Sequence, residues 1–333
     1  MFVLESYPLA VVFCVITMFC WGSWANTQKL AKKGWRFELF YWDYTIGVLL
    51  LTLILGLSLG SHGSVGRSFL EDFGHVSHAS VHSALLGGAI FNLANILLVA
   101  AIDIAGMSVA FPVGIGIALV LGVVLNYIAD PIGNAALLFA GVALVVLAII
   151  LDAVAYRKIP GSAAGVSTKG LILSVACGVL MGFFYRFVAA SMYSDFTRPV
   201  EGKFGPYGAL FVFALGILLS NIVINTLVMK RPFVGSPVSY GDYFKGSFGT
   251  HLTGILGGII WGVGMSFNII AAGRASFAIS YGLGQGATMV AALWGVFIWK
   301  EFRTAPAGTS RFIAAMFLAF VVGLGLIILA RMS

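Results

Sequence analysis

Long runs of apolar residues separated by short polar segments are the first feature of this sequence. Each run is close to the length of about 20 residues that a helix needs to cross roughly 30 Å of hydrocarbon. Only helices satisfy their own backbone groups in lipid at these lengths, and the short alternating segments of a membrane β-barrel are missing from the sequence. We therefore predict ten transmembrane helices, at about 8–28, 38–59, 84–104, 108–129, 135–155, 170–192, 207–229, 251–272, 276–299 and 311–331.

Glycine-containing segments recur at a nearly constant distance. A shift of 170 residues places Leu86-Gly87-Gly88 on Leu256-Gly257-Gly258, Gly114 on Gly284 and Gly116 on Gly286, and a weaker match at 160 places Gly22 on Gly182. Each copy holds five apolar runs, and because five is odd the second copy must cross the membrane in the opposite sense.

The fold class that follows is an all-α membrane protein whose ten transmembrane helices form two inverted five-helix repeats. The first repeat covers residues 1–157, the second covers 170–333, and a short cytoplasmic linker at 158–169 joins them. Two inverted halves around one central site are typical of secondary transporters.

Composition and charge support a membrane protein rather than a nucleic-acid-binding one. Apolar residues make up 60% of the chain and charged residues 9%, and the mean hydropathy is +1.03. No soluble core needs so much apolar surface, so the lipid bilayer is the expected partner. The net charge of +7 reflects topology, because 13 of the 19 Lys and Arg residues lie in loops on one face. The positive-inside rule makes that face cytoplasmic and places both termini outside.

Two ionisable residues inside the apolar runs stand out, because a charge in hydrocarbon costs several kcal/mol unless it is paired or hydrated. The rise per residue puts Asp43 about 8 Å and Arg186 about 24 Å from the cytoplasmic face, too far apart for a simple salt bridge. We predict Asp43 as a proton-coupling residue. Alternatively, it caps the nearby loop or pairs with Lys29 or Lys33. Arg186 either faces the substrate or extends to the outer surface.

Polar and aromatic side chains well inside the predicted helices are the candidates for a substrate site. Carboxamides both donate and accept, which suits hydroxyl, amide and ureido groups, and aromatic faces stack on sugar rings or planar heterocycles. The alternative is that the amides tie helices together and the indoles anchor at a membrane interface. The predicted substrate-binding set is Trp21, Trp24, Asn26, Asn92, Asn95, Arg186, Trp261, Asn268, Tyr281 and Gln285.

Two glycine-containing segments, Phe111-Pro112-Val113-Gly114 and Gly282-Leu283-Gly284-Gln285-Gly286, occupy equivalent places in the repeat. Pro112 lacks a backbone donor and can kink its helix. Broken helices expose backbone groups near a central cavity, although the glycines could equally serve helix packing alone.

The loop at 60–82 carries four histidines, His62, His75, His78 and His82. The spacing would put the last three on one helical face, which suits a transition metal, but no cysteine or carboxylate cage surrounds them. A solvated loop is the alternative, so we predict no metal site and no cofactor and leave metal binding by the loop open.

Enzymatic and ATP-driven functions find little support in the sequence. It has no Gly-x-x-x-x-Gly-Lys-Ser/Thr phosphate loop, which argues against ATP-driven pumping. His251 is the only histidine in a predicted helix, and we expect no cluster of histidines with carboxylates at a membrane face. A membrane-embedded enzyme would need such a cluster of catalytic side chains, so we predict that the protein is not an enzyme.

Several segments resemble the ureide permease family of plants and its bacterial relatives, which belongs with the glucose/ribose porters in the drug/metabolite transporter superfamily. They are Cys20-Trp21-Gly22-Ser23-Trp24, Trp42-Asp43-Tyr44-Thr45-Ile46, 110–116, 125–131 and 294–302, and the resemblance covers almost the whole chain. It implies ten helices in two inverted repeats and uptake of small polar metabolites, often with protons. Plant members of the family import allantoin, uracil and related ureides.

The sequence departs from the plant pattern at its centre. The plant proteins have a long central loop with a nucleotide-binding-like motif, whereas about a dozen residues join the halves here. The compact form fits a bacterial inner-membrane protein with periplasmic termini, and bacterial relatives are commonly described as sugar or drug transporters.

We predict a secondary-active transporter of a small neutral polar metabolite, a monosaccharide or a ureide, taken up with protons by alternating access. The first, third, fourth, sixth, eighth and ninth runs should line its central cavity. A lipophilic drug or metabolite exporter is the alternative, with a non-transporting membrane-embedded enzyme or scaffold behind it. A homodimer is left open.

Overall fold

The computed structural model describes residues 1–160 and 167–332, and this part of the chain is helical without a named β-strand. It holds ten helices long and apolar enough to cross a membrane, which confirms the predicted number. The helical elements are α1 (Tyr7–Ser23), η1 (Trp24–Leu30), α2 (Phe37–Leu57), α3 (Phe69–Asp72), α4 (His78–Ala105), α5 (Met107–Ala110), η2 (Phe111–Ile115), α6 (Gly116–Ala129), α7 (Ala135–Arg157), α8 (Thr168–Ser191), α9 (Pro206–Lys230), α10 (Tyr240–Phe244), α11 (Phe248–Ala275), α12 (Phe277–Gly284), α13 (Ala287–Leu293), η3 (Trp294–Ile298), η4 (Glu301–Thr304) and α14 (Thr309–Leu329).

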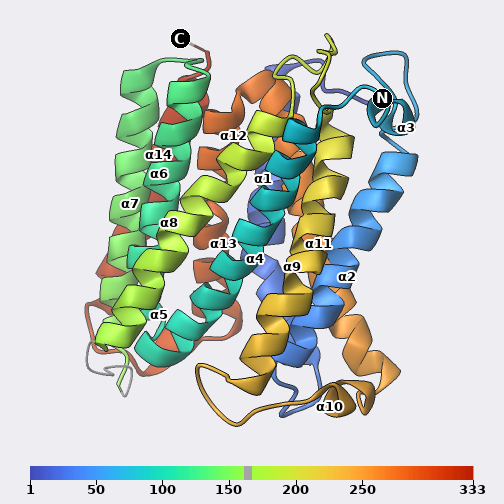
Figure 1. Ribbon diagram of the computed structural model, residues 1–333. Helices are drawn as coiled ribbons and strands as arrows, with labels where there is room; N and C mark the ends of the chain where they lie inside the picture. The colour runs from blue at the N-terminus through green and yellow to red at the C-terminus, as the bar shows by residue number, and fades with distance from the viewer. Residues whose placement is uncertain (161–166, 333) are drawn as a thin grey trace.

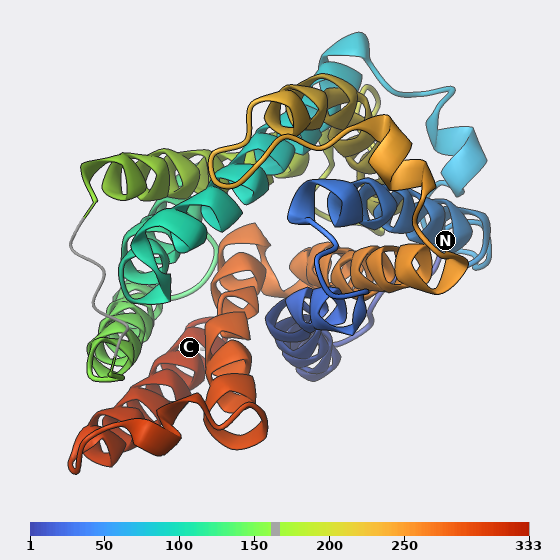
Figure 2. The same cartoon turned by 90° about the horizontal axis from the view of Figure 1, so that it is seen from below.

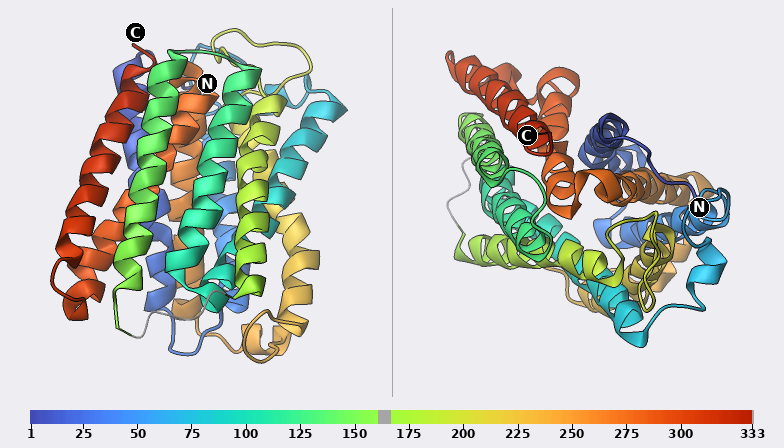
Figure 3. Two further views of the ribbon diagram at one scale, coloured as in Figure 1. Left: turned by 90° about the vertical axis from the view of Figure 1, so that its left-hand side faces the viewer. Right: turned by 90° about the horizontal axis from the view of Figure 1, so that it is seen from above.

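The ten spans form one bundle with two distinct ends. Both chain termini and α3 lie at one end, which we call the terminal end, and α10 lies at the opposite end (Figures 1 and 3). The loops at the α10 end carry the 13 Lys and Arg residues that the sequence grouped on one face, so we call it the basic end. The predicted linker at 158–169 starts from this end and lies partly outside the described residues.

Helices from the two halves of the chain pack against each other in matched pairs. Figure 2 shows α2 beside α11 and α4 beside α9. A Cβ on Gly258 of α11 would overlap the carbonyl oxygen of Tyr44 on α2, and a Cβ on Gly88 of α4 would overlap that of Phe213 on α9. The glycines are 258 − 88 = 170 residues apart and their partners 213 − 44 = 169. This correspondence is compatible with two inverted five-helix repeats, and the close approach lets backbones pack tightly in lipid.

The starts of equivalent helices use the same cap. Ser77 before α4 and Ser247 before α11 each accept a hydrogen bond from the backbone N–H three residues later, from Ser80 and Thr250. Such a serine satisfies one of the donors that a helix start leaves open. The two caps are also 247 − 77 = 170 residues apart.

Three of the spans are not regular α-helices throughout. The first continues beyond Ser23 as the 3₁₀ helix η1, the fourth contains the π-helical turn η2 around Pro112, and the ninth breaks at Gln285 and Gly286 between α12 and α13. The breaks in the fourth and ninth spans fall in the two glycine-containing segments that the sequence singled out. They position irregular backbone beside the site described next.

Candidate functional site

A cavity of about 310 Å³ runs from the middle of the bundle toward the basic end. Its deepest residues come from mid-helix positions on α4, α8, α11 and the α12–α13 break, and its walls end at Lys29 and Glu301 near the basic end. All six spans that we expected to line a cavity contribute residues, and α2, α7 and η4 add more. The volume lies in the range of sites for small metabolites.

Aromatic side chains are frequent in the cavity wall. The ring of Trp261 lies 4.4 Å from that of Phe91 and 6.1 Å from that of Trp21, the latter pair nearly parallel at 14°. Trp24 completes this wall against Tyr44, with the ring centroids 4.8 Å apart. Three predicted site residues, Trp21, Trp24 and Trp261, therefore meet at one cavity although they come from opposite halves of the chain.

Carboxamides add polar groups to the same cavity. Asn95 donates from Nδ2 to the Tyr41 hydroxyl at 3.2 Å, and Asn26 accepts from the indole N–H of Trp299 at 2.9 Å. Gln285 also lines the cavity, and among the described residues no side-chain hydrogen bond to its carboxamide is formed. Its donor and acceptor groups are available to a polar solute.

The other four predicted site residues lie outside the cavity lining. Asn92 donates to the Ser220 hydroxyl at 3.0 Å, between α4 and α9. Arg186 is partly exposed on α8, within electrostatic reach of Asp130.

Asn268 and Tyr281 belong to a buried layer between the cavity and the terminal end. Asn268 accepts from the Tyr185 hydroxyl and donates to the Ser280 carbonyl, both at 2.7 Å. The Tyr281 hydroxyl lies 3.2 Å from the carbonyls of Ala118 and Met181. These fully buried groups join α8, α11, α12 and α6, so they close the cavity on the side of the terminal end.

Asp43 is buried but does not line the cavity. Its carboxylate accepts from the Tyr243 hydroxyl at 2.6 Å and lies 2.9 Å from Nδ1 of His251. The structure thus differs from two expectations, because neither Lys29 nor Lys33 is its partner and a histidine does meet a carboxylate near the basic end. The pair was hidden in the sequence because 208 positions separate its members. A role of Asp43 in proton coupling stays a prediction.

Aromatic and polar contacts between the halves surround the mouth of the cavity at the basic end. Lys29 places Nζ 4.0 Å from the ring centroid of Trp299, and the Trp294 indole donates to the Ser23 hydroxyl at 2.8 Å. A second cavity of about 520 Å³ lies nearby and is bordered by the Arg36–Glu38 ion pair. Charges are therefore sparse inside the first cavity and more frequent around its entrance.

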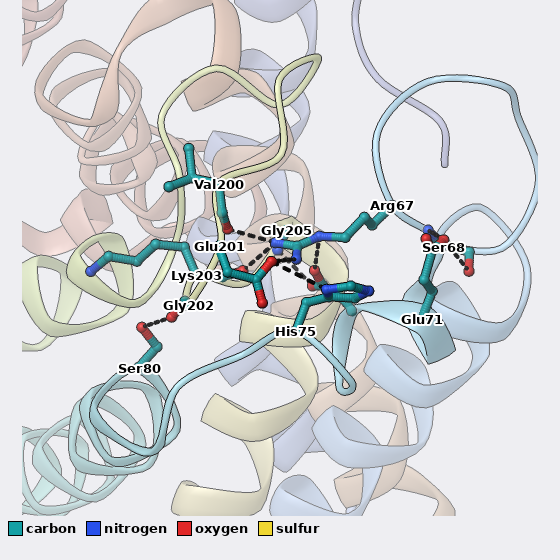
Figure 4. A network of polar contacts seen from close by, with 11 residues as sticks. Arg67, Ser68, Glu71, His75, Ser80, Val200, Glu201, Gly202, Lys203 and Gly205 are labelled. Atoms are coloured by element: carbon teal, nitrogen blue, oxygen red, sulfur yellow. Dashed lines mark hydrogen bonds and ion pairs between the residues drawn. The ribbon is translucent and has the colours of Figure 1, made fainter.

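A charged network ties the loops of the terminal end together (Figure 4). Arg67 donates to the carbonyls of Val200 and Lys203 at 2.7 Å and forms ion pairs with Asp72 at 3.3 Å and Glu201 at 3.6 Å. Arg67 is 8% exposed, so its guanidinium links the loop after α2 to the loop before α9 away from water.

Asp72 is the buried acid of this network. Burial raises its pKa to about 6, although the backbone N–H of Gly205 and the charge of Arg67 favour the ionised form. The carboxyl group therefore titrates in a range where the pH can change the strength of the network.

The histidine loop shows a different arrangement from the expected one. The helix α4 begins at His78, so His75 does not share its face, and Nδ1 of His75 instead lies 3.2 Å from Glu201 (Figure 4). Among the described residues no group of three or more histidines, cysteines or acids is placed to hold a metal ion.

A bundle of ten spans with broken helices around a central cavity is the build of a membrane transporter. The family model described as ureide permease matches residues 40–164 and 157–330. The chain belongs to the ureide permease family.

Named relatives match over nearly the full chain. Ureide permease 1 of Arabidopsis thaliana is 22% identical over 383 aligned residues, covering 98% of each chain. Ureide permease 2 of the same plant is also 22% identical, at 96% of each. A solved structure titled only "Crystal structure of protein" matches with a TM-score of 0.59, 16% identity and 98% coverage of both chains, which supports the fold alone.

Proposed function

We propose that this chain is a secondary-active transporter that takes up a small neutral polar solute, a ureide or a monosaccharide, together with protons. The cavity carries this proposal, because it combines indole walls with the carboxamides of Asn26, Asn95 and Gln285. Planar ureides and sugar rings stack on aromatic faces, and carboxamides match their donors and acceptors. The plant relatives are named ureide permeases, which favours a ureide.

Alternating access is the proposed mechanism. The cavity extends toward the basic end, while the Asn268–Tyr185 layer and the Arg67 network lie between it and the terminal end. With the basic end in the cytoplasm, this is an inward-facing state, and rocking of the two halves would expose the same site outside. A bacterial inner membrane with both termini periplasmic belongs to this proposal. Association into a homodimer stays a prediction.

Counterflow in proteoliposomes tests the proposal. Vesicles loaded with unlabelled uracil, allantoin or glucose should accumulate the same labelled solute only when they contain the protein. Flux of lipophilic cations alone would instead favour the exporter, and no saturable flux of any solute would refute transport.

Two asparagines on α4 provide a matched pair of variants for this assay. Asn95→Ala removes a carboxamide from the cavity and should raise the KM by roughly five- to tenfold, the size of one lost hydrogen bond. Asn92→Ala removes the same group three residues away, outside the lining, and should leave the KM unchanged. Equal effects of the two variants would contradict the assigned site.

A further inference from the structure

Two carboxyl groups from opposite halves of the chain meet beside the mouth of the cavity. Asp152 lies on α7, one helical turn before Tyr156, so both side chains share a helix face. The Tyr156 hydroxyl donates to Oε2 of Glu301 at 2.7 Å, and Tyr156 and Glu301 both line the cavity. Asp152 and Glu301 are close enough to interact electrostatically. The pair therefore lies between the buried face of α7 and the cavity.

Asp152 has no counter-charge in this setting. It is 9% exposed, and its surroundings offer burial and the negative charge of Glu301. Among the described residues, no ion pair reaches Asp152 or Glu301. A buried carboxylate without a donor or a cation is costly, and a nearby negative charge adds to that cost, so binding a proton at Asp152 relieves both.

Basic side chains near the pair are directed elsewhere. Lys29 lies over the ring of Trp299, and Lys158 places Nζ 4.9 Å from the ring centroid of Phe312 on α14. The remaining cations at the ends of α7, η4 and α14 near the pair are exposed; they are Arg157, Lys300, Arg303 and Arg311. Space for the pair comes from Gly295, where a Cβ would overlap the Tyr156 hydroxyl and the Glu301 carboxylate.

Asp43 provides the contrast. Its carboxylate is held by Tyr243 and His251, and it does not border the cavity. Among the described residues no hydrogen bond to the Asp152 carboxyl group is formed, and this group lies one helical turn from Tyr156 in the cavity wall.

We propose that Asp152 and Glu301 together bind the proton that drives uptake, with Tyr156 holding Glu301 in place. In the inward-facing state the proton leaves Asp152 or Glu301 for water in the cavity. After the halves rock, a proton from the outer side returns to the pair. This inference rests on the proposed transport function and adds the group that couples it to the pH gradient.

The decisive experiment measures accumulation of the solute found by counterflow, with and without a pH gradient of one unit. One proton per solute permits up to about tenfold accumulation. The wild type should respond to the gradient, whereas Asp152→Asn and Glu301→Gln should give a ratio near one. Asp103→Asn, which removes an exposed carboxyl on α4 at the same end, should keep the wild-type response.

Infrared spectroscopy of the purified protein tests the pair without any substrate. The wild type at neutral pH should show the C=O stretch of a protonated carboxyl group, and Asp152→Asn should lack it. Glu301→Gln serves if Asp152→Asn does not fold, and it should change the pH at which that band appears.

The outcomes separate the two proposals. No counterflow by the wild type refutes the proposed function. Counterflow together with unchanged gradient-driven accumulation by Asp152→Asn, or an unchanged carboxyl band in that variant, overturns the assignment of the proton pair alone.

Discussion

The two ends of the bundle are closed in different ways. At the terminal end, the buried guanidinium of Arg67 connects two loops through two carbonyls and two carboxylates. At the basic end, two indole hydrogen bonds, the Lys29–Trp299 contact and the Tyr156–Glu301 hydrogen bond join the halves around the cavity. A second guanidinium, that of Arg36, also links the halves at this end by donating to the carbonyls of Val234 and Ser236, but its side chain is 27% exposed. Charge-assisted, buried hydrogen bonds are stronger than exposed or neutral ones. The comparison teaches that a buried charged network, which we call the lock, holds the terminal end, whereas the guanidinium link at the basic end is more exposed and lies near the cavity.

Removing the Arg67 guanidinium should have the largest effect on the difference between the two ends. Arg67→Met leaves Asp72 buried without its cation and two carbonyls without a donor, which should destabilise the protein by about 3–5 kcal/mol. The melting temperature in detergent measures the loss of stability. Labelling of a cysteine placed at Ser280, in the buried layer, by a membrane-impermeant reagent measures access from the terminal end. Arg198→Met is the control, because among the described residues the one ion pair of Arg198 is with Asp195, at 3.6 Å and in an exposed position. Equal melting temperatures for the two variants would contradict the lock.

The pH should tune the same lock through Asp72. Its pKa in the folded protein, about 6, lies above the unfolded value of 3.8, so the folded protein binds the proton more tightly. The stabilisation from this group is complete below pH 3.8 and is lost as the pH rises through about 6, a difference of about 3 kcal/mol.

Thermal unfolding of the wild type and Asp72→Asn at several pH values measures this effect. The difference in melting temperature should move in favour of the wild type as the pH falls from 7 to 4, because asparagine does not titrate. A difference that stays constant with pH would show that Asp72 does not titrate in this range.

The contacts between the halves at the basic end should be easier to break, and their loss should destabilise the protein less than the loss of Arg67. Trp299→Ala removes the hydrogen bond to Asn26 and the contact with Lys29, together about 1–2 kcal/mol. Faster solute exchange with a modest fall in melting temperature is expected, since the ring is 41% exposed. Trp42→Ala is the control, because Trp42 lies on α2 outside the cavity lining. Similar solute exchange rates in the two variants would argue against an entrance to the cavity at Trp299.

The smallest expected effect on stability comes from two turns with positive φ, one at each end of the bundle. Gly106 after α4 and Ser276 after α11 occupy equivalent turns with φ of 76° and 81°. This region favours glycine, so Ser276→Gly should stabilise the protein by about 1 kcal/mol. The gain is reduced by the loss of the weak hydrogen bond that the Ile279 N–H donates to the Ser276 hydroxyl. Gly106→Ser should destabilise it. Chemical or thermal unfolding that shows the opposite signs would mean that the two turns are not equivalent in energy.

Much of the fold could be predicted because its causes are local. The number of spans follows from apolar length, and the broken fourth and ninth helices follow from Pro112 and from the glycines around Gln285. Six of the ten predicted site residues line the cavity. Asn92, Asn268 and Tyr281 instead contact neighbouring helices, and Arg186 is partly exposed, because depth along a helix says nothing about its rotation.

The sequence by itself determined that this chain crosses a membrane ten times and which loops carry the positive charge. Both properties add up residue by residue along the chain, since hydrocarbon thickness and positive charge act on each segment separately. Only the tertiary structure decided which buried acids have partners. Asp43 meets His251 across 208 positions and Tyr156 meets Glu301 across 145, and such contacts depend on how helices rotate and pack against each other.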